Sequence, residues 1–330
     1  MKILITGATG YVGHPLALKL ASQGNIVHIL VRDLGSSQIP FHPNIRVFKG
    51  DLTDSKSIST AIQGCIQVFH VAAYARLSSK NPDLFYQINV VGTENVLNEA
   101  LKEGVQKFVF TSSVAVFGPS TQFPLRENDP RIAKFQNDYE LTKSIAESIV
   151  KKFNHYGLPT VIVNLSRVYG PGTATYSNGV NKFISGAIHN RYTFIPDKLG
   201  ISNNYVFIDD AINGHVLAME KGIAGESYII GGENISYKQL FETIKRFAGK
   251  KTRFISIPYP LIYYGLSLIY FFSKLIFVKE TISPKILDQL FINRIVSCQK
   301  ATLQLGYNFT SLDSGIRKTI HSLKQQNHGN

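Results

Sequence analysis

Two kinds of segment alternate along the first 165 residues of this 330-residue chain. Short runs rich in apolar and β-branched residues predict strands, and the longer segments between them predict helices. The predicted strands are Lys2–Thr6, Asn25–Val31, Ile45–Lys49, Gln67–Val71, Lys107–Thr111 and Thr160–Asn164, and the predicted helices are Tyr11–Gln23, Asp54–Ile62, Asp83–Glu103 and Asp138–Tyr156. Nearly continuous apolar strands that alternate with helices predict an α/β fold with a doubly wound parallel sheet, covered by helices on both faces.

The pattern loosens after Asn164, where the turn-rich stretch Tyr169–Gly179 predicts a loop over the sheet. Further on, the sequence predicts strands at Tyr205–Ile208 and Glu226–Ile230, with the helix Ala211–Lys221 between them. Ser236 is the expected N-cap of an amphipathic helix that ends at Phe247. We therefore expect one domain made of residues 1–165 plus about 205–232, and a smaller, mostly helical lobe made of about 166–204 plus 233–330.

A glycine-rich turn, Gly7-Ala8-Thr9-Gly10-Tyr11-Val12-Gly13, joins the first predicted strand to the first predicted helix. Gly7 allows a tight turn, Gly10 lets the main chain approach a pyrophosphate, and Gly13 lets the helix pack closely on the strand. The unpaired N–H groups at the helix N-terminus then face the phosphates. At the first strand of a βαβ unit this turn predicts a dinucleotide-binding Rossmann fold. The residues expected at the cofactor are Gly7, Thr9, Gly10, Tyr11, Val12 and Gly13.

The sequence TGATGYVG resembles the glycine turn of the extended short-chain dehydrogenases/reductases, the group that contains NAD-dependent epimerases/dehydratases and dihydroflavonol reductases. The resemblance covers the chain from Met1 to about Asn234. It implies further cofactor contacts from Asp51 and Leu52 near the adenine, Ala72 and Ala73 beneath the cofactor, and Val168 near the nicotinamide. It also implies a homodimer formed by the predicted helices Asp83–Glu103 and Asp138–Tyr156.

The end of the second predicted strand bears on the choice between NAD and NADP. A carboxylate at this place holds a free ribose, whereas a cation suits a 2′-phosphate. Val31 stands where NAD-binding epimerases carry Asp, and Arg32 matches the arginine of dihydroflavonol reductase-like members. Asp33 could still reach a ribose, so NAD stays open, but Arg32 favours NADP.

The sequence Tyr139-Glu140-Leu141-Thr142-Lys143 places a phenol and an ammonium four residues apart, on one face of a predicted helix. A phenol is a poor base at neutral pH unless a nearby cation stabilises the phenolate. A predicted strand ends in Thr111-Ser112-Ser113, at the sheet edge where such folds bind ligands. Tyr139 and Lys143 match the family's catalytic triad, whose serine falls on Ser113 or, less well, on Ser112.

Asn89, in the predicted helix Asp83–Glu103, falls where the family has an asparagine near the site. A plain position on the helix surface is the alternative.

Composition and charge narrow the class of protein. A hydrophobic content of 44% excludes a disordered chain, and two cysteines form neither a disulfide framework nor a zinc site. No signal-peptide pattern precedes the first predicted strand, so we expect a cytoplasmic protein, or one held peripherally at the inner membrane face. From Ser236 onward, 14 Lys and Arg face 4 Asp and Glu, which suits an anionic ligand, a membrane surface or nucleic acid. This part of the chain has too few exposed-aromatic patterns of the kind that read RNA to favour nucleic acid.

The segment 257–278 carries one charge, Lys274, in 22 residues. It predicts a buried helix over the active-site cleft, a helix in a membrane interface, or a transmembrane span. Pro258, Pro260 and Gly265 argue against the span. The first two interpretations both imply an apolar substrate.

The resemblance and the triad together predict an NADP-dependent carbonyl reductase or alcohol dehydrogenase that acts on an apolar ketone, aldehyde or alcohol. The alternative is a nucleotide-sugar epimerase or dehydratase that uses the same triad. In that group an arginine that grips the diphosphate and a histidine stand where this chain has Asn203 and Phe207. A cofactor-binding or RNA-binding member without catalysis is a further alternative, against which Tyr139 and Lys143 argue.

Overall fold

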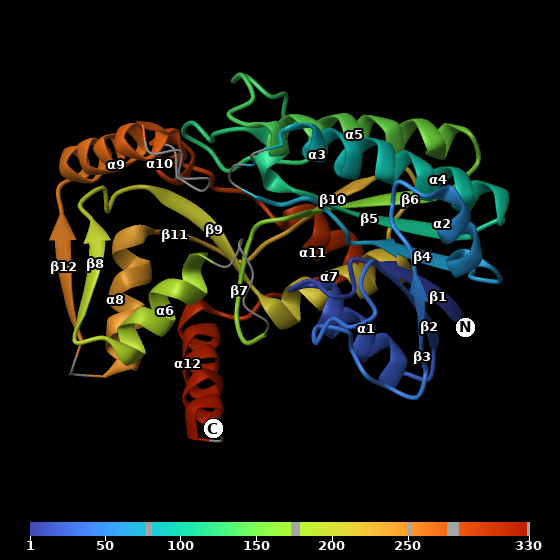
Figure 1. Ribbon diagram of the computed structural model, residues 1–330, viewed down its shortest axis with the longest axis horizontal. Helices are drawn as coiled ribbons and strands as arrows, with labels where there is room; N and C mark the ends of the chain where they lie inside the picture. Colours follow the sequence, from blue (N-terminus) through green and yellow to red (C-terminus); the bar gives the residue numbers. More distant parts are fainter. Residues whose placement is uncertain (77–78, 80, 173–178, 250–251, 276–283, 329–330) are drawn as a thin grey trace.

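A seven-stranded parallel sheet with its helices forms one half of the protein, on the right in Figure 1. The computed structural model describes residues 1–76, 79, 81–172, 179–249, 252–275 and 284–328. The strand order is β10-β6-β5-β4-β1-β2-β3. The strands are β1 Lys2–Thr6, β2 Ile26–Val31, β3 Ile45–Lys49, β4 Gln67–His70, β5 Lys107–Ser113, β6 Thr160–Leu165 and β10 Ser227–Ile230. The doubly wound Rossmann fold predicted from the sequence is confirmed.

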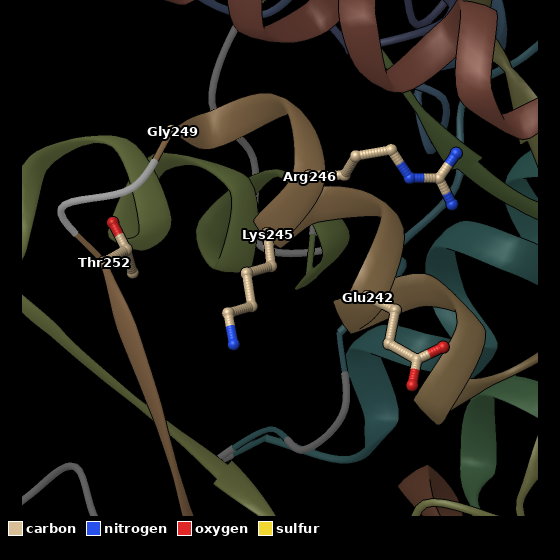
Figure 2. Close-up of a pocket in the computed structure, with 5 residues that line it drawn as sticks. All are labelled: Glu242, Lys245, Arg246, Gly249 and Thr252. Atoms are coloured by element: carbon tan, nitrogen blue, oxygen red, sulfur yellow. The ribbon is translucent and has the colours of Figure 1, made fainter.

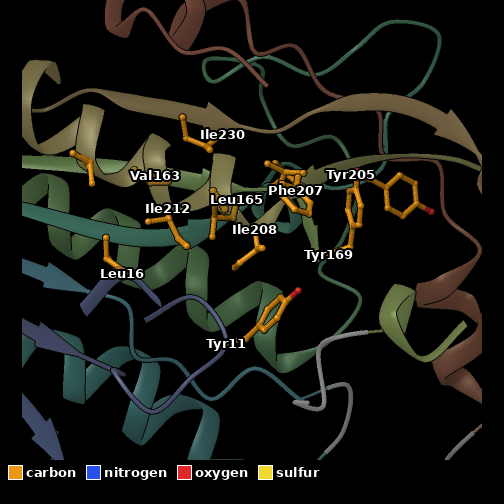
Figure 3. Close-up of a cluster of buried hydrophobic side chains, with 14 of the residues drawn as sticks. Tyr11, Leu16, Val163, Leu165, Tyr169, Tyr205, Phe207, Ile208, Ile212 and Ile230 are labelled. Carbon is orange, nitrogen blue, oxygen red and sulfur yellow. The ribbon is translucent and has the colours of Figure 1, made fainter. Parts of the chain in front are cut away.

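Helices cover the sheet on both faces. One face packs against α2 Ser55–Ile62, α4 Gly92–Lys102 and α5 Asp138–His155, and the other packs against α1 Gly13–Ser22 and α7 Ile208–Lys221 (Figure 1). Side chains alternate along β1 between two cores, with Ile3 and Ile5 in one and Leu4 in the other. On the α7 face, Ile208 and Ile212 lie in the same core as Val163 and Ile230 (Figure 3).

Local signals in the sequence fix several helix ends. Gly24 and Gly104 follow α1 and α4 with φ of 85° and 73°, a conformation that glycine adopts readily. Ser236 caps α8 Tyr237–Ala248 in a reciprocal capping box with Gln239, so this predicted N-cap is confirmed. At the start of α5, the Asn137 side chain accepts a hydrogen bond of 2.8 Å from Glu140 N, which places Tyr139 in the first turn of the helix.

The chain beyond the seven-stranded sheet builds two smaller sheets and further helices. One sheet contains β7 Arg167–Tyr169, β9 Ser202–Phe207 and β11 Glu233–Ser236, and the other pairs β8 Tyr192–Pro196 with β12 Arg253–Ile257. The remaining helices are α3 Asp83–Tyr86, the π-helical turn η1 Gln87–Val91, the 3₁₀ turn η2 Val114–Phe117, α6 Gly179–His189, α9 Tyr259–Leu275, α10 Lys285–Leu290, α11 Gln299–Leu305 and α12 Leu312–His328. The division into two domains stays a prediction.

Helix α9 occupies most of the apolar segment 257–278, whose last residues lie outside the described part of the chain. The first interpretation of this segment, a buried helix over the cleft, is wrong for the described residues. Six large apolar side chains of α9 are 53–71% exposed: Leu261, Tyr264, Leu268, Ile269, Phe271 and Phe272. Among the described residues, none of the helices is both long enough and apolar enough to cross a bilayer.

Candidate active site

The glycine turn lies between β1 and α1, at the carboxyl edge of the sheet. Gly7 has a φ of 77°, and a Cβ added to it would lie 2.6 Å from the backbone nitrogen of Ala72. A Cβ on Gly13 would overlap the carbonyl oxygen of Gly7. Both glycines therefore keep the turn, α1 and the end of β4 in close contact, as the sequence predicted.

Gly10 keeps the outer side of this turn open. Its N–H donates to Gly7 O over 2.9 Å, and an added Cβ would contact that same oxygen alone, at 3.1 Å. Thr9 and Val12 are half-buried beside it, and Val12, the residue before α1, makes no side-chain cap. The open backbone at Gly10 and the uncapped N-terminus of α1 leave room and free N–H groups for a pyrophosphate. The residues present at this turn therefore fit the predicted dinucleotide.

The phenol of Tyr11 points away from the glycine turn. Its hydroxyl donates to the carbonyl oxygen of Gly170 over 2.7 Å, and Asn181 Nδ2 lies 3.2 Å from the same hydroxyl. Burial raises the pKa of this phenol. Tyr11 can therefore contribute its backbone to a cofactor, while its side chain is bound to the loop after β7.

Arg32 is exposed at the carboxyl end of β2. Among the described residues, no hydrogen-bond or ion-pair partner holds its guanidinium. The neighbouring Asp33 is engaged locally, because its Oδ1 accepts the Gly35 N–H at 2.9 Å. The Arg32 guanidinium and the second carboxylate oxygen of Asp33 are therefore both exposed at the place predicted for the ribose.

Asp51 and Leu52 follow β3, as the resemblance implied. The Asp51 carboxylate accepts from the backbone N–H and the hydroxyl of Thr53, at 2.9 and 2.7 Å. Leu52 is buried near Gly92, where an added Cβ would lie 2.8 Å from the leucine Cβ.

A buried histidine connects the glycine turn to the sheet edge. His70 Nδ1 lies 2.6 Å from the Thr6 hydroxyl, and its Nε2 lies 3.0 Å from the Thr93 hydroxyl. Burial, with the charge of Lys143, lowers the pKa of His70 to about 3, so the ring is neutral. Ala72 and Ala73 follow this strand and are half-buried.

Ser113 and Tyr139 face one another from the end of β5 and the first turn of α5. Tyr139 is half-buried. Loss of solvent raises the pKa of its phenol, whereas the nearby Ser113 hydroxyl and the charge of Arg294 lower it. The structure therefore brings together two members of the predicted triad. Ser112, the weaker candidate, is buried and lies close to Glu147 instead.

Lys143 lies one turn after Tyr139 and is 1% exposed. Its Nζ donates to the carbonyl oxygen of Thr111 over 2.7 Å and lies 3.9 Å from the centre of the Phe110 ring. Burial lowers the pKa of Lys143 to about 7. The triad thus lies at one edge of the sheet. The charge of Lys143 also acts on His70, whose ring contacts Thr6 at the end of β1, just before the glycine turn.

Asn89 is buried, so its alternative as a residue of the helix surface is wrong. It lies in η1, and its Oδ1 accepts the Tyr74 N–H at 2.7 Å. Its Nδ2 donates to the Thr142 hydroxyl at 3.1 Å. Asn89 therefore ties the loop after β4 to α5, between Tyr139 and Lys143.

Val168 is half-buried on β7, where it pairs with Val206 of β9. The two positions that depart from the nucleotide-sugar pattern, Asn203 and Phe207, are both buried on β9.

Two groups of charged residues near Tyr139 were not predicted from the sequence. Glu147 is buried one turn beyond Lys143 and accepts from Asn164 Nδ2 at 2.6 Å. Burial raises the pKa of Glu147. Glu140 is also buried, and Arg131 and Arg294 donate to its two carboxylate oxygens over 2.6 and 2.9 Å. Tyr139, Lys143 and Glu147 are spaced four residues apart, so the sequence already indicated that Glu147 shares their helix face.

A hollow of about 380 Å³ at the C-terminal end of α8 lies apart from these residues (Figure 2). It is open and is lined by Glu242, Lys245, Arg246, Gly249 and Thr252. None of these five is a candidate site residue.

The profile of the NAD dependent epimerase/dehydratase family matches residues 3–231, from β1 to the end of β10. The chain belongs to this family. The prediction of an NAD(P)-dependent enzyme of the short-chain dehydrogenase/reductase type is thereby confirmed, together with the resemblance that carried it.

Two relatives carry names that concern sterols. Sterol demethylase protein B of Methylococcus capsulatus is 31% identical over 274 residues, which are 82% of this chain and 81% of that protein. A 3-beta-hydroxysteroid dehydrogenase of Mycolicibacterium neoaurum is 27% identical over 323 residues, 93% of this chain and 86% of that one.

A solved structure shows the same fold. The UDP-glucose 4-epimerase of Thermus thermophilus in complex with NAD superposes with a TM-score of 0.79, at 21% identity, over 98% of this chain and 99% of that one.

Proposed function

We propose that this protein is an NADP-dependent carbonyl reductase or alcohol dehydrogenase whose substrate is an apolar ketone, aldehyde or alcohol. The observation that carries the proposal is the Tyr139 phenol facing the Ser113 hydroxyl at the carboxyl end of β5, with the buried Lys143 one helical turn behind it. A proton donor and a hydroxyl that orients the substrate oxygen are what carbonyl reduction requires.

Each triad residue has a separate role in this proposal. Ser113 holds the substrate oxygen by a hydrogen bond, and Tyr139 donates a proton to that oxygen in reduction or removes it in oxidation. The bound nicotinamide supplies or accepts the hydride. Lys143 would bind the ribose. Its positive charge would also favour the phenolate, and burial lowers the pKa of Lys143 to about 7, so that charge is partial at neutral pH.

Most of the residues that would hold the dinucleotide follow strands β1, β2, β3 and β4 at the carboxyl edge of the seven-stranded sheet. The open backbone of the glycine turn would bind the pyrophosphate, and Arg32 would pair with a 2′-phosphate, which is our reason for preferring NADP over NAD. The other contacts proposed are Thr9, Tyr11 and Val12 through the backbone, Asp51 and Leu52 at the adenine, Ala72 and Ala73 beneath the cofactor, and Lys143 and Val168 at the nicotinamide end.

We propose a sterol-like polycyclic alcohol or ketone as the substrate class. The names of the two sterol-related relatives support this choice. The nucleotide-sugar alternative needs cations for a diphosphate, and two half-buried arginines, Arg294 and Arg167, are already engaged. Arg294 pairs with Glu140, and Arg167 donates to the Tyr237 hydroxyl over 3.0 Å.

The test is NADPH consumption by the purified protein with cyclohexanone, decanal and a 3-ketosteroid, alongside Tyr139→Phe. We expect turnover with at least one of these carbonyls, a loss of more than about 1000-fold in Tyr139→Phe, and NADPH affinity within about twofold of the parent. An active Tyr139→Phe would rule out the acid/base role. If UDP-sugars are converted with no net change in nicotinamide absorbance, the epimerase or dehydratase alternative is correct.

We also propose that α9 contacts a membrane surface. Leu261, Tyr264, Leu268 and Phe271 recur every three or four residues and form one exposed apolar stripe. The segment 250–285 contains six Lys and Arg and one Glu, a balance that suits anionic lipid headgroups. Such a surface would bring the enzyme to lipid-soluble substrates.

A homodimer through α4 and α5 is the assembly that we propose. Exposed apolar residues on these and the adjoining turns support it, namely Tyr86, Val91, Leu101 and Leu141. Native mass spectrometry of the parent and of Leu141→Glu tests it, with a monomeric parent as the outcome against it.

A further inference from the structure

The buried carboxylate of Glu140 joins three segments of the chain around Tyr139. Arg131 donates to one carboxylate oxygen and Arg294 to the other, and both guanidiniums are nearly buried, with side chains 12% and 11% exposed. The Gln136 N–H adds a third donor at 3.1 Å. Because Glu140 follows Tyr139 directly, this ion triplet fixes the first turn of α5.

The same two arginines hold the turn that follows Ser113. Arg131 Nη1 donates to the carbonyl oxygens of Ala115 and Val116, at 2.8 and 3.0 Å. Arg294 Nε donates to the carbonyl oxygen of Gly118 at 3.1 Å. The turn after Ser113 and the start of α5 are therefore bound to one another through the triplet, and their relative position sets the distance from the serine hydroxyl to the phenol.

Arg294 comes from the C-terminal part of the chain. Its N–H donates to Ser202 O at 2.9 Å, and its carbonyl oxygen accepts the Asn204 N–H at 3.1 Å, so its backbone lies against β9. A shift of β9 together with the segment around Arg294 would be transmitted to the first turn of α5 through the Arg294 side chain.

We propose that Arg131, Glu140 and Arg294 form a positioning clamp that holds Ser113 and Tyr139 in register and links the C-terminal lobe to the proton-transfer centre. The inference rests on the acid/base role proposed for Tyr139. Arg294 and Glu140 act on the phenol with opposite signs, because the cation stabilises the phenolate and the carboxylate destabilises it. The other groups that act on the phenol are Ser113 and Glu147, and Lys143 lies one turn along the same helix.

The first test is the pH dependence of kcat/KM for oxidation of a 3β-hydroxysteroid with NADP⁺, where the acidic limb reports the base. Arg294→Met should move this limb upward by about one pH unit, and Glu140→Gln should move it downward. Arg294→Lys should restore most of the parent profile. Arg246→Met is the matched control, because it breaks an Arg–Asp pair that is exposed on α8 and α12, and should leave the profile unchanged.

Opposite shifts are what a purely structural role does not produce. A limb that stays in place, or moves the same way in both variants, would overturn the clamp.

The second test does not depend on turnover. Hydrogen exchange of the amides in residues 113–118 and 138–143 should become at least about tenfold faster in Arg294→Met and stay unchanged in Arg246→Met. If the parent has no oxidoreductase activity, the proposed function is wrong. The exchange result still shows whether the clamp exists. Unchanged exchange in Arg294→Met refutes the clamp whatever the activity.

Discussion

The candidate active site at the end of β5 buries polar side chains, whereas the outer face of α9 exposes apolar ones. In the site, polar side chains are buried and bonded: His70 to Thr6 and Thr93, Asn89 to Tyr74 and Thr142, and Lys143 to the backbone of Thr111. On α9, large apolar side chains such as Leu268 and Phe271 are 60% exposed.

Each region reverses the ordinary rule of burial, and each reversal has a cost in free energy. Buried polar groups are retained where their orientation matters, which suits chemistry. Exposed apolar groups are retained where another apolar phase covers them, which suits contact. If both proposals hold, reaction and membrane attachment lie in two separate regions that can be altered independently.

The largest effect on cofactor binding should come from filling the space at Gly13. Gly13→Val places its side chain against the carbonyl oxygen of Gly7, so the turn must open. We expect NADPH affinity to fall more than about 100-fold and stability by about 2–3 kcal/mol. Fluorescence titration with NADPH and thermal unfolding measure both. Gly24→Ala is the control, since a Cβ there meets nothing within 4 Å and the cost is confined to its φ of 85°. Tight NADPH binding by Gly13→Val would refute the placement of the cofactor.

A charge on α9 tests the other half of the comparison. Leu268→Glu with Phe271→Glu removes two apolar side chains from the stripe, each worth about 1.5–3 kcal/mol when buried in an apolar phase. We expect binding to vesicles of mixed anionic and neutral phospholipid to weaken at least about 30-fold, with turnover of a water-soluble ketone unchanged. Vesicle flotation measures binding. Phe41→Glu is the control, because Phe41 is 93% exposed in the connection between β2 and β3. A parent protein that does not float with the vesicles contradicts the proposal.

Removing the cation at the end of β2 should give a smaller, selective effect. Arg32→Ser is expected to weaken NADPH binding about tenfold while NADH affinity stays within about twofold, since NADH lacks the 2′-phosphate that the guanidinium would pair with. The two affinities of one variant are each other's control. Equal weakening of both nucleotides would mean that Arg32 does not discriminate between them.

The smallest effect concerns stability and pH. Between about pH 7 and pH 10 the unfolded chain carries a proton on Lys143 that the folded chain has released, so this lysine favours folding more as the pH rises. Lys143→Met should therefore exceed the parent in stability by about 1–2 kcal/mol near pH 6.5, with the advantage shrinking toward pH 10. Chemical denaturation across this range measures it, with the exposed Lys152→Met as control. A pH-independent difference would contradict the burial of a titrating lysine.

Much of the nucleotide half could be predicted because its determinants are local. Gly7 and Gly13 are required by backbone contacts that only glycine allows, and Tyr139 and Lys143 share a helix face by spacing alone. The capping box at Ser236 is likewise encoded within four residues. Such features need no knowledge of the rest of the fold.

The C-terminal contributions could not be predicted for the opposite reason. Arg294 is 154 positions from Glu140, and the pair exists only once β9 has placed the arginine. The exposure of α9 was equally hidden, because an apolar composition fits a core and a membrane interface alike. Asn89 is an intermediate case. The resemblance placed it near the site, but its burial could not be predicted from the sequence.

The bond from the Tyr11 hydroxyl to Gly170 fastens the glycine turn to the loop after β7, and Asn181 of α6 braces the same point. A displacement at Gly170 is therefore coupled to the backbone of Tyr11, because one buried hydroxyl bonds the two segments. The glycine turn and the start of the loop after β7 thus form one mechanical unit around the Tyr11 side chain.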